Sequence, residues 1–188
     1  MKKELIKNGI KVALILLFAI AATYYIYNKF KDEGNIDYSS DSLDVVYREK
    51  TGDRIDITKV TPVTDSVGLS SNTHSISVKN NLTIGVNYKV KIVDNKDKIL
   101  EDECGNSSIP KEDIRISVKI NNKPNRIYNL VELEDGILVD GKIDALKSNN
   151  IIIRTWINKD SLLPTGSTMH YHGIIQVIEE DNILAINK

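Results

Sequence analysis

The segment Ile84–Val93, IGVNYKVKIV, decides the fold class, because apolar and polar residues alternate along most of its length. Side chains of a strand point alternately to its two faces, so a period of two predicts a β-strand with one buried face. The residues of that face are Ile84, Val86, Tyr88, Val90 and Ile92. We therefore predict that this strand lies in the core of a β-sheet domain.

Short segments rich in Val, Ile, Thr and Tyr, separated by Gly, Pro, Asn and Asp, predict further strands on both sides of it. They are Leu43–Arg48, Arg54–Val60, Thr73–Lys79, Ile114–Ile120, Leu130–Leu133, Ile137–Val139, Asn150–Asn158 and Thr168–Ile178. Asp135-Gly136 predicts a hairpin between Leu130–Leu133 and Ile137–Val139, and Asp144–Lys147 predicts one helical turn. Because no long amphipathic helix follows Tyr27, we predict an all-β fold. It would be an antiparallel β-sandwich of immunoglobulin-like or jelly-roll type, with Trp156 as its core aromatic residue.

The uncharged run Val12–Tyr27, VALILLFAIAATYYIY, predicts one N-terminal transmembrane helix before this domain. Four lysines precede the run against the single acid Glu4, which predicts a cytoplasmic N-terminus and an extracytoplasmic domain. The alternative is a cleaved signal peptide with its site at Ala19-Ile20-Ala21. We favour the uncleaved anchor, because cleavage would leave an exposed tyrosine-rich N-terminus.

These assignments predict four regions: a cytoplasmic N-terminus over 1–11, the anchor over 12–27, a polar tether over 28–43 and the β-sandwich over 44–188. The formal net charge is −1, of which the first eleven residues contribute +3, so the exported remainder carries about −4. This balance excludes the basic surface of a nucleic-acid-binding protein. The single cysteine, Cys104, has no partner for an internal disulfide and is expected to be a lone thiol in a loop.

His170-Tyr171-His172 is the strongest candidate for chemistry, because two histidines two residues apart on a strand share a face. A zinc site needs a third ligand, for which His74 or Asp65 is available. The alternative is two histidines on a solvated face, and we expect no cofactor and no enzymatic activity. The acidic run Glu101–Glu103, with Asp94 and Asp97, is typical of a solvated loop, with a loose calcium site as the less favoured interpretation.

The last strand predicts a surface for association. It is apolar and carries no charge until Glu179 and Glu180, which are placed as gatekeepers of an edge strand. Ile174, Gln176 and Ile178 are the residues through which such an edge would accept a neighbouring strand.

A family resemblance covers 60–179. The segments TPVTDSVGL, SISVKNN, VNYKVKIVD, IIIRTWI and HGIIQVI resemble, in that order, the exported β-sandwich proteins of Gram-positive bacteria related to camelysin and TasA. The resemblance implies a cell-surface or matrix protein whose sandwich associates by strand exchange, although the uncleaved anchor departs from the family. We therefore expect a non-enzymatic, membrane-anchored domain that binds lipid through its helix and a protein partner or itself through the sandwich. The alternative is an envelope metal-binding module or a hydrolase-type enzyme that uses His170 and His172.

Overall fold

The computed structural model describes residues 35–39, 42–101 and 108–180. The predicted anchor, the cytoplasmic N-terminus and Cys104 lie outside these ranges. Among the described residues, no helix is long and apolar enough to cross a membrane. The chain divides into two units, Met1–Asn35 and Ile36–Lys188, and all described residues except Asn35 belong to the second.

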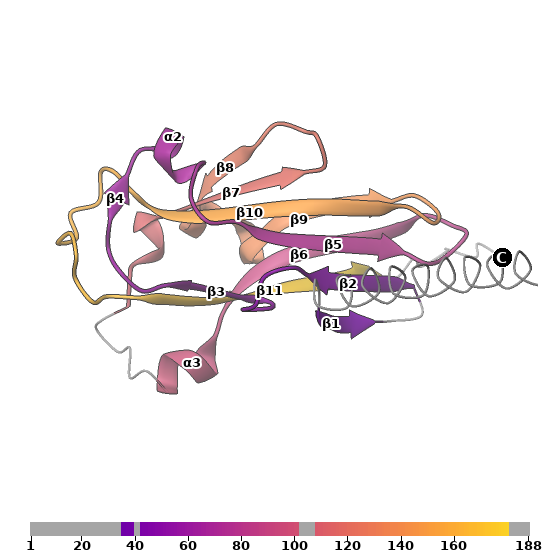
Figure 1. The fold of residues 1–188 in the computed structure, drawn as a ribbon, viewed down its shortest axis with the longest axis horizontal. Coiled ribbons are helices and arrows are strands. Elements are labelled where there is room, and N and C mark those ends of the chain that lie inside the picture. The colour runs from indigo at the N-terminus through magenta and orange to yellow at the C-terminus, as the bar shows by residue number, and fades with distance from the viewer. Residues whose placement is uncertain (1–34, 40–41, 102–107, 181–188) are drawn as a thin grey trace, which may run out of the picture. The chain divides into compact units, whose positions relative to one another are not determined.

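The described part of the second unit is an all-β fold with two sheets (Figure 1). The strands are β1 (Asn35–Ser39), β2 (Leu43–Tyr47), β3 (Arg54–Ile57), β4 (Pro62–Val63), β5 (His74–Asn80), β6 (Val86–Asp94), β7 (Ile114–Ile120), β8 (Arg126–Asn129), β9 (Ile137–Ile143), β10 (Ser148–Asn158) and β11 (Tyr171–Glu180). The first sheet has the order β1-β2-β5-β10-β7-β8, and β4 also pairs with β10, in parallel. The second sheet has the order β3-β11-β6-β9.

The short helices lie in the connections. They are α2 (Asp65–Gly68), α3 (Lys96–Glu101) and the 3-10 turns η2 (Lys111–Asp113), η3 (Leu130–Glu132) and η4 (Glu134–Gly136). α3 lies within the connection that the sequence predicted to be an acidic loop.

The core lies between the inner faces of the two sheets, and β6 contributes to it as predicted. Val86, Tyr88, Val90 and Ile92 are all at most 4% exposed. Ile84 does not belong to this face, because β6 begins only at Val86 and Ile84 lies in the preceding turn with 56% of its surface exposed. From the other sheet, Ile151 and Ile153 of β10 are fully buried.

The prediction of a hairpin around Asp135-Gly136 is wrong. Residues 130–132 form the 3-10 turn η3, in which the Glu132 carboxylate accepts a hydrogen bond from the backbone N–H of Asn129. The strand of this region is β8, which ends at Asn129, directly before η3. The turn itself is present, with φ of 50° at Asp135 and 70° at Gly136. A Cβ at Gly136 would lie 2.1 Å from the carbonyl oxygen of Ile92, so this glycine lets the chain pass β6 closely, and β9 then pairs with β6.

Two smaller predictions also need correction. The predicted tether over 28–43 contains β1, which adds to the edge of the first sheet next to β2. The predicted helical turn Asp144–Lys147 is a turn between β9 and β10, because Leu146 has a φ of 58°, which a right-handed helix does not accept.

Candidate functional site

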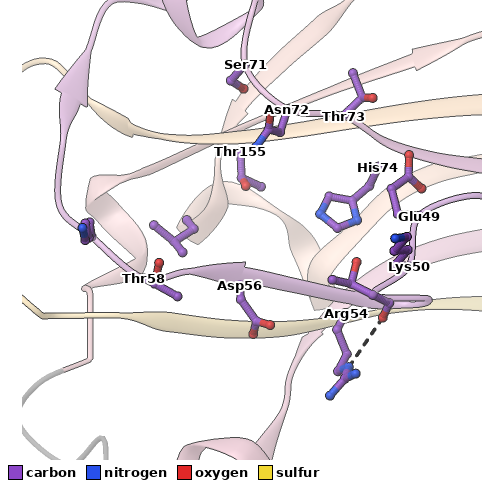
Figure 2. A pocket seen from close by; sticks show the side chains of 13 residues that line it. Glu49, Lys50, Arg54, Asp56, Thr58, Ser71, Asn72, Thr73, His74 and Thr155 are labelled. Carbon is purple, nitrogen blue, oxygen red and sulfur yellow. Dashed lines mark hydrogen bonds between the residues drawn. The ribbon is translucent and has the colours of Figure 1, made fainter.

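A polar cleft opens along one edge of the second sheet. The edge strand β3 pairs with β11 on one side, and on its other side lies a cleft of about 720 Å³ (Figure 2). Its walls carry charged groups of both signs and several hydroxyl groups, among them those of Glu49, Lys50, Thr58, Lys59, Thr73 and Thr155. The cleft is therefore suited to a polar ligand rather than to an apolar one.

The backbone of β3 presents hydrogen-bonding groups on the side away from β11. The Ile175 N–H donates to the Asp53 carbonyl oxygen over 2.8 Å, so alternate β3 residues point toward β11 and the others point away from it. Arg54, Asp56 and Thr58 are the residues that point away. The Arg54 N–H donates to Thr51 at 3.2 Å. In the described part of the chain, Asp56 and Thr58 therefore offer backbone groups to an added strand.

The three histidines of the sequence lie around this corner of the fold. His74 begins β5 and lines the cleft, whereas His172 lies on β11 and His170 directly precedes that strand. The rings of His170 and His172 are 4.9 Å apart between centroids. Among the described residues, no group of three or more His, Cys, Asp or Glu side chains is arranged to hold a metal ion.

His172 connects β11 to β3. Its side chain is buried, and its Nδ1 lies 2.6 Å from Oδ1 of Asp56, the residue directly opposite in the antiparallel pair. Nδ1 of His170 lies 3.0 Å from the carbonyl oxygen of Thr168. Each ring therefore has an oxygen atom at Nδ1 that orients it, and the His172–Asp56 contact ties the edge strand to its neighbour.

His74 is the histidine of the cleft wall. Burial lowers the pKa of its imidazole, and the negative charges of Glu49 and Asp56 oppose that shift only in part. Glu49 is itself held in place, because its carboxylate accepts a 2.7 Å hydrogen bond from the Ser75 N–H. Acidification would therefore place a new positive charge on a wall that already carries Lys50.

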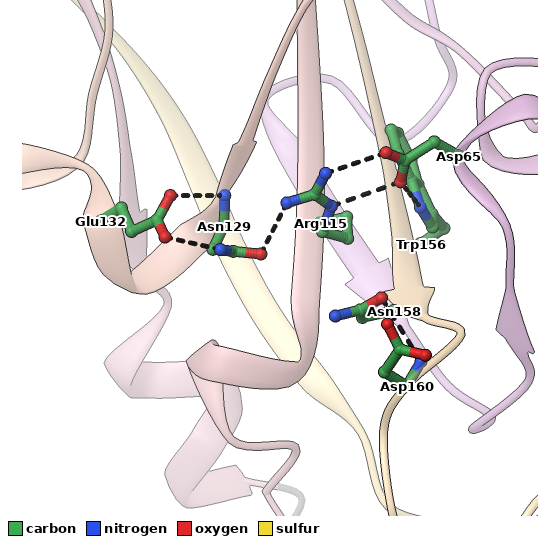
Figure 3. Close-up of polar contacts among 7 residues, drawn as sticks. All are labelled: Asp65, Arg115, Asn129, Glu132, Trp156, Asn158 and Asp160. Atoms are coloured by element: carbon green, nitrogen blue, oxygen red, sulfur yellow. Dashed lines mark hydrogen bonds and ion pairs between the residues drawn. The ribbon is translucent and has the colours of Figure 1, made fainter.

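Asp65, the other candidate for a third metal ligand, lies in a different network (Figure 3). Its carboxylate accepts hydrogen bonds from Nε and Nη2 of Arg115 at 3.3 and 2.8 Å and from Nε1 of Trp156 at 3.2 Å. The Arg115 guanidinium lowers the pKa of this carboxyl group despite some burial. Nη1 of Arg115 donates to Oδ1 of Asn129 at 2.8 Å. Asp65 is therefore a structural residue that joins α2 to β7 and β10.

Gly68 completes the attachment of α2. A Cβ at this position would lie 2.2 Å from Cδ2 of Trp156, so the helix backbone lies directly on the indole ring. Trp156 is buried, as the sequence predicts, but under α2 and not among the residues that fill the space between the sheets. The segment TPVTDSVGL therefore contains two residues, Asp65 and Gly68, that attach α2 to the rest of the fold.

The predicted edge strand is only partly an edge. Ile174 pairs with Arg54 of β3 and with Val93 of β6, so it lies inside the sheet, contrary to the prediction. Gln176 and Ile178 pair with β6, and among the described residues no strand pairs with them on their other side. Side chains of β2 and of the residue before it contact this stretch, since the Tyr47 hydroxyl donates to the Ile175 carbonyl at 2.9 Å and the Ser42 hydroxyl donates to the Glu179 carboxylate.

Strand pairing explains why the sequence placed Ile174 at an edge and did not identify β3 as one. Arg54-Ile55-Asp56-Ile57 has the alternation of a half-buried strand, but nothing in it states which strand it pairs with. Comparison of the chain with protein-family models, with curated proteins and with solved structures gives no significant match.

Proposed function

We propose that this chain is a membrane-anchored, extracytoplasmic β-sandwich, without enzymatic activity, that binds an extended segment of a partner protein or of a second copy along the open edge of β3. The observation that carries the proposal is the position of the 720 Å³ cleft beside an unpaired strand edge in the described part of the chain. In strand addition, main-chain hydrogen bonds supply affinity and the pockets beside the edge select side chains.

The cleft suggests the chemistry of the bound segment. β3 has four residues, so the segment would pair over about 13 Å. The charged residues that line the cleft are the bases Lys50, Arg54 and Lys59 and the acids Glu49 and Asp56. This mixture favours a polar segment that carries both signs of charge over an apolar one.

The anchor and the surface location rest on Val12–Tyr27 and on the lysines that precede it. The resemblance to camelysin and TasA supports association by strand exchange. An immunoglobulin-like or jelly-roll class is supported by the path of the chain, because β5 and β6 belong to different sheets, as do β10 and β11.

The alternative of an envelope metal-binding module or hydrolase depends on His170 and His172. His172 is buried and contacts Asp56, the residue opposite it on β3, so we favour a structural role for it. Stoichiometric zinc binding by the intact protein, lost on substitution of both histidines by alanine, would restore this alternative.

Proline substitutions at two adjacent residues test the strand-addition proposal. Thr58→Pro removes an N–H that points away from β11, whereas Ile57→Pro removes one that faces Tyr171 of β11. We expect Thr58→Pro to leave the domain folded and to prevent partner binding, and Ile57→Pro to destabilise the domain.

Binding would be read from a photo-crosslinking residue at Asn72, which lines the cleft, in the full chain in its membrane. The matched control places the same residue at Lys123, in the exposed turn between β7 and β8. We expect an adduct from position 72 only, and we expect Thr58→Pro to remove it. Failure of the folded chain to crosslink at position 72, or crosslinking that survives Thr58→Pro, would contradict the proposal.

A further inference from the structure

Two exposed apolar side chains lie in neighbouring turns at one end of the sandwich. The turn between β5 and β6 carries Ile84, which is 56% exposed, and the turn between β9 and β10 carries Leu146, which is 61% exposed. The two turns are joined by a hydrogen bond from the Leu146 N–H to the Leu82 carbonyl over 3.0 Å. We call the two turns, residues 81–85 and 144–147, the apolar end (Figure 1).

Asn80 fixes the geometry of the apolar end. It is fully buried, and its Nδ2 lies 2.7 Å from the carbonyl oxygen of Ile84 and 3.1 Å from those of Ile143 and Asp144. Its Oδ1 accepts a 2.8 Å hydrogen bond from the Leu82 N–H. One buried amide thus ties both turns together, so Ile84 and Leu146 are presented on a rigid base.

Leu146 is also unusual in its backbone. Its φ of 58° is a left-handed conformation that glycine and asparagine adopt readily and that disfavours a bulky side chain. A residue that is both exposed and strained contributes little to the core, so the fold gives no reason for leucine at this position. Such an outlier points to a role outside the folded domain.

Three exposed lysines lie at or beside the apolar end, and Asp44 is opposite one of them, Lys79, in the pairing of β2 with β5. Lys79, Lys142 and Lys147 are exposed, and the Lys142 side chain lies over Gly85, where a Cβ would come within 2.2 Å of its Cε. Asp144 is the acid of the turns themselves. At the neighbouring end of β11, Glu180 contacts Lys89 and Glu179 contacts Ser42.

We propose that the apolar end inserts Ile84 and Leu146 into the interfacial region of the bilayer that holds the anchor, with the lysines at the level of anionic lipid headgroups. Aliphatic side chains flanked by lysines are the composition of interfacial membrane contacts. Two side chains are too small a surface for a stable protein–protein interface, which needs about 800 Å² on each partner. A tethered domain needs only weak affinity, because the anchor keeps its local concentration at the membrane high.

The length of the chain permits this contact. Residues 28–34 separate the apolar run from β1 and can span about 25 Å when extended. β1 has five residues, about 17 Å, and runs toward the end of the sandwich at which β2 begins, where the Asn81 N–H donates to the Ser42 carbonyl (Figure 1). The segment 28–34, about 25 Å when extended, is therefore longer than β1, about 17 Å.

Fluorescent labelling of the full chain in liposomes tests this inference, which rests on the membrane anchor of the proposed function. In a Cys104→Ser background, Leu146→Cys carries an environment-sensitive dye, and Leu162→Cys is the matched control. Leu162 is a leucine that is 98% exposed and lies in the connection after β10, the strand whose first residues adjoin the apolar end.

We expect the label at 146, but not at 162, to show blue-shifted emission and to be quenched by lipids that are brominated along their acyl chains. A chain that floats with the liposomes while both labels report water would overturn the inference and leave the anchor intact. A chain that does not float would overturn the anchor and the inference together.

Discussion

Gly68→Ala tests the attachment of α2 to the rest of the fold. The new Cβ would lie 2.2–2.5 Å from Cδ2, Cε2 and Cγ of Trp156, well inside normal contact distances. The indole cannot simply move away, because the ring is 5% exposed and its Nε1 donates to Asp65. Either the helix lifts or the ring shifts and loses that hydrogen bond.

The expected loss of stability follows from these two costs. Overpacking of a buried site costs about 1–3 kcal/mol, and the loss of the Nε1–Asp65 hydrogen bond adds about 1 kcal/mol. Alanine in place of glycine returns up to about 1 kcal/mol of helix propensity. The net expectation is a destabilisation of about 1–3 kcal/mol, or roughly 2–10 °C in Tm for a domain of this size.

Trp156 is the single tryptophan of the chain, so its fluorescence reports both the local change and global unfolding. Thermal and urea denaturation of the full chain in detergent would be compared for the wild type, Gly68→Ala and the control Val67→Ala, whose side chain is 55% exposed. We expect a lowered midpoint and an altered native emission for Gly68→Ala only. An unchanged midpoint with unchanged emission would refute the close contact between Gly68 and the indole.

Three further predictions concern the core, the cleft and the network of Asp65. Val90→Asp places a charge at a fully buried position and should cost about 3–5 kcal/mol, whereas Gln176→Asp on the exposed face of β11 should stay within about 0.5 kcal/mol in the same denaturation assay. Burial lowers the pKa of His74 below its unfolded value of 6.5, so the contribution of the neutral imidazole to stability is full above that pH and is lost as the pH falls toward the folded pKa. The Tm of His74→Asn should therefore fall less than the Tm of the wild type between neutral pH and pH 5. Asp65→Asn should lower stability by about 1 kcal/mol near pH 7, and since the folded pKa of Asp65 lies below 3.8, the difference from the wild type should disappear as the pH falls through it.

The sequence predicts those parts of the fold that local alternation determines. The strands β5, β6, β7 and β10 appear where the period of two is clear, and they bury alternate residues along most of their length. Alternation mispredicts Ile84, because the apolar positions continue at every second residue from Ile92 back to Ile84 although the strand β6 begins only at Val86. Alternation predicts that a segment can form a strand with one buried face, but it does not predict at which residue the backbone hydrogen bonds of that strand end.

Strand order and side-chain networks are not contained in any local pattern. Asp65, Arg115 and Trp156 are far apart in the sequence and meet only because α2, β7 and β10 pack together. In the same way, HGIIQVI has the composition of an exposed edge, yet β3 covers its first half. In the part of the chain that the structure describes, the shorter and more charged β3 has an open edge, because pairing follows from the packing of both sheets and not from the hydrophobicity of one segment.

The two proposed surfaces are connected by a single strand. β5 begins with His74, which lines the cleft, and ends with Asn80, which fixes the apolar end. Seven residues of β-strand separate these sites by about 20 Å. If the apolar end rests on the bilayer and β5 runs along the membrane normal, the cleft lies about 20 Å above it, beyond the Debye length of about 8 Å at physiological ionic strength. At that distance salt would screen the charges of the lipid headgroups, so a partner segment in the cleft would interact mainly with the charges of Lys50 and Glu49. Binding measured on the full chain should consequently depend on substitutions at these two residues and not on the fraction of anionic lipid in the membrane.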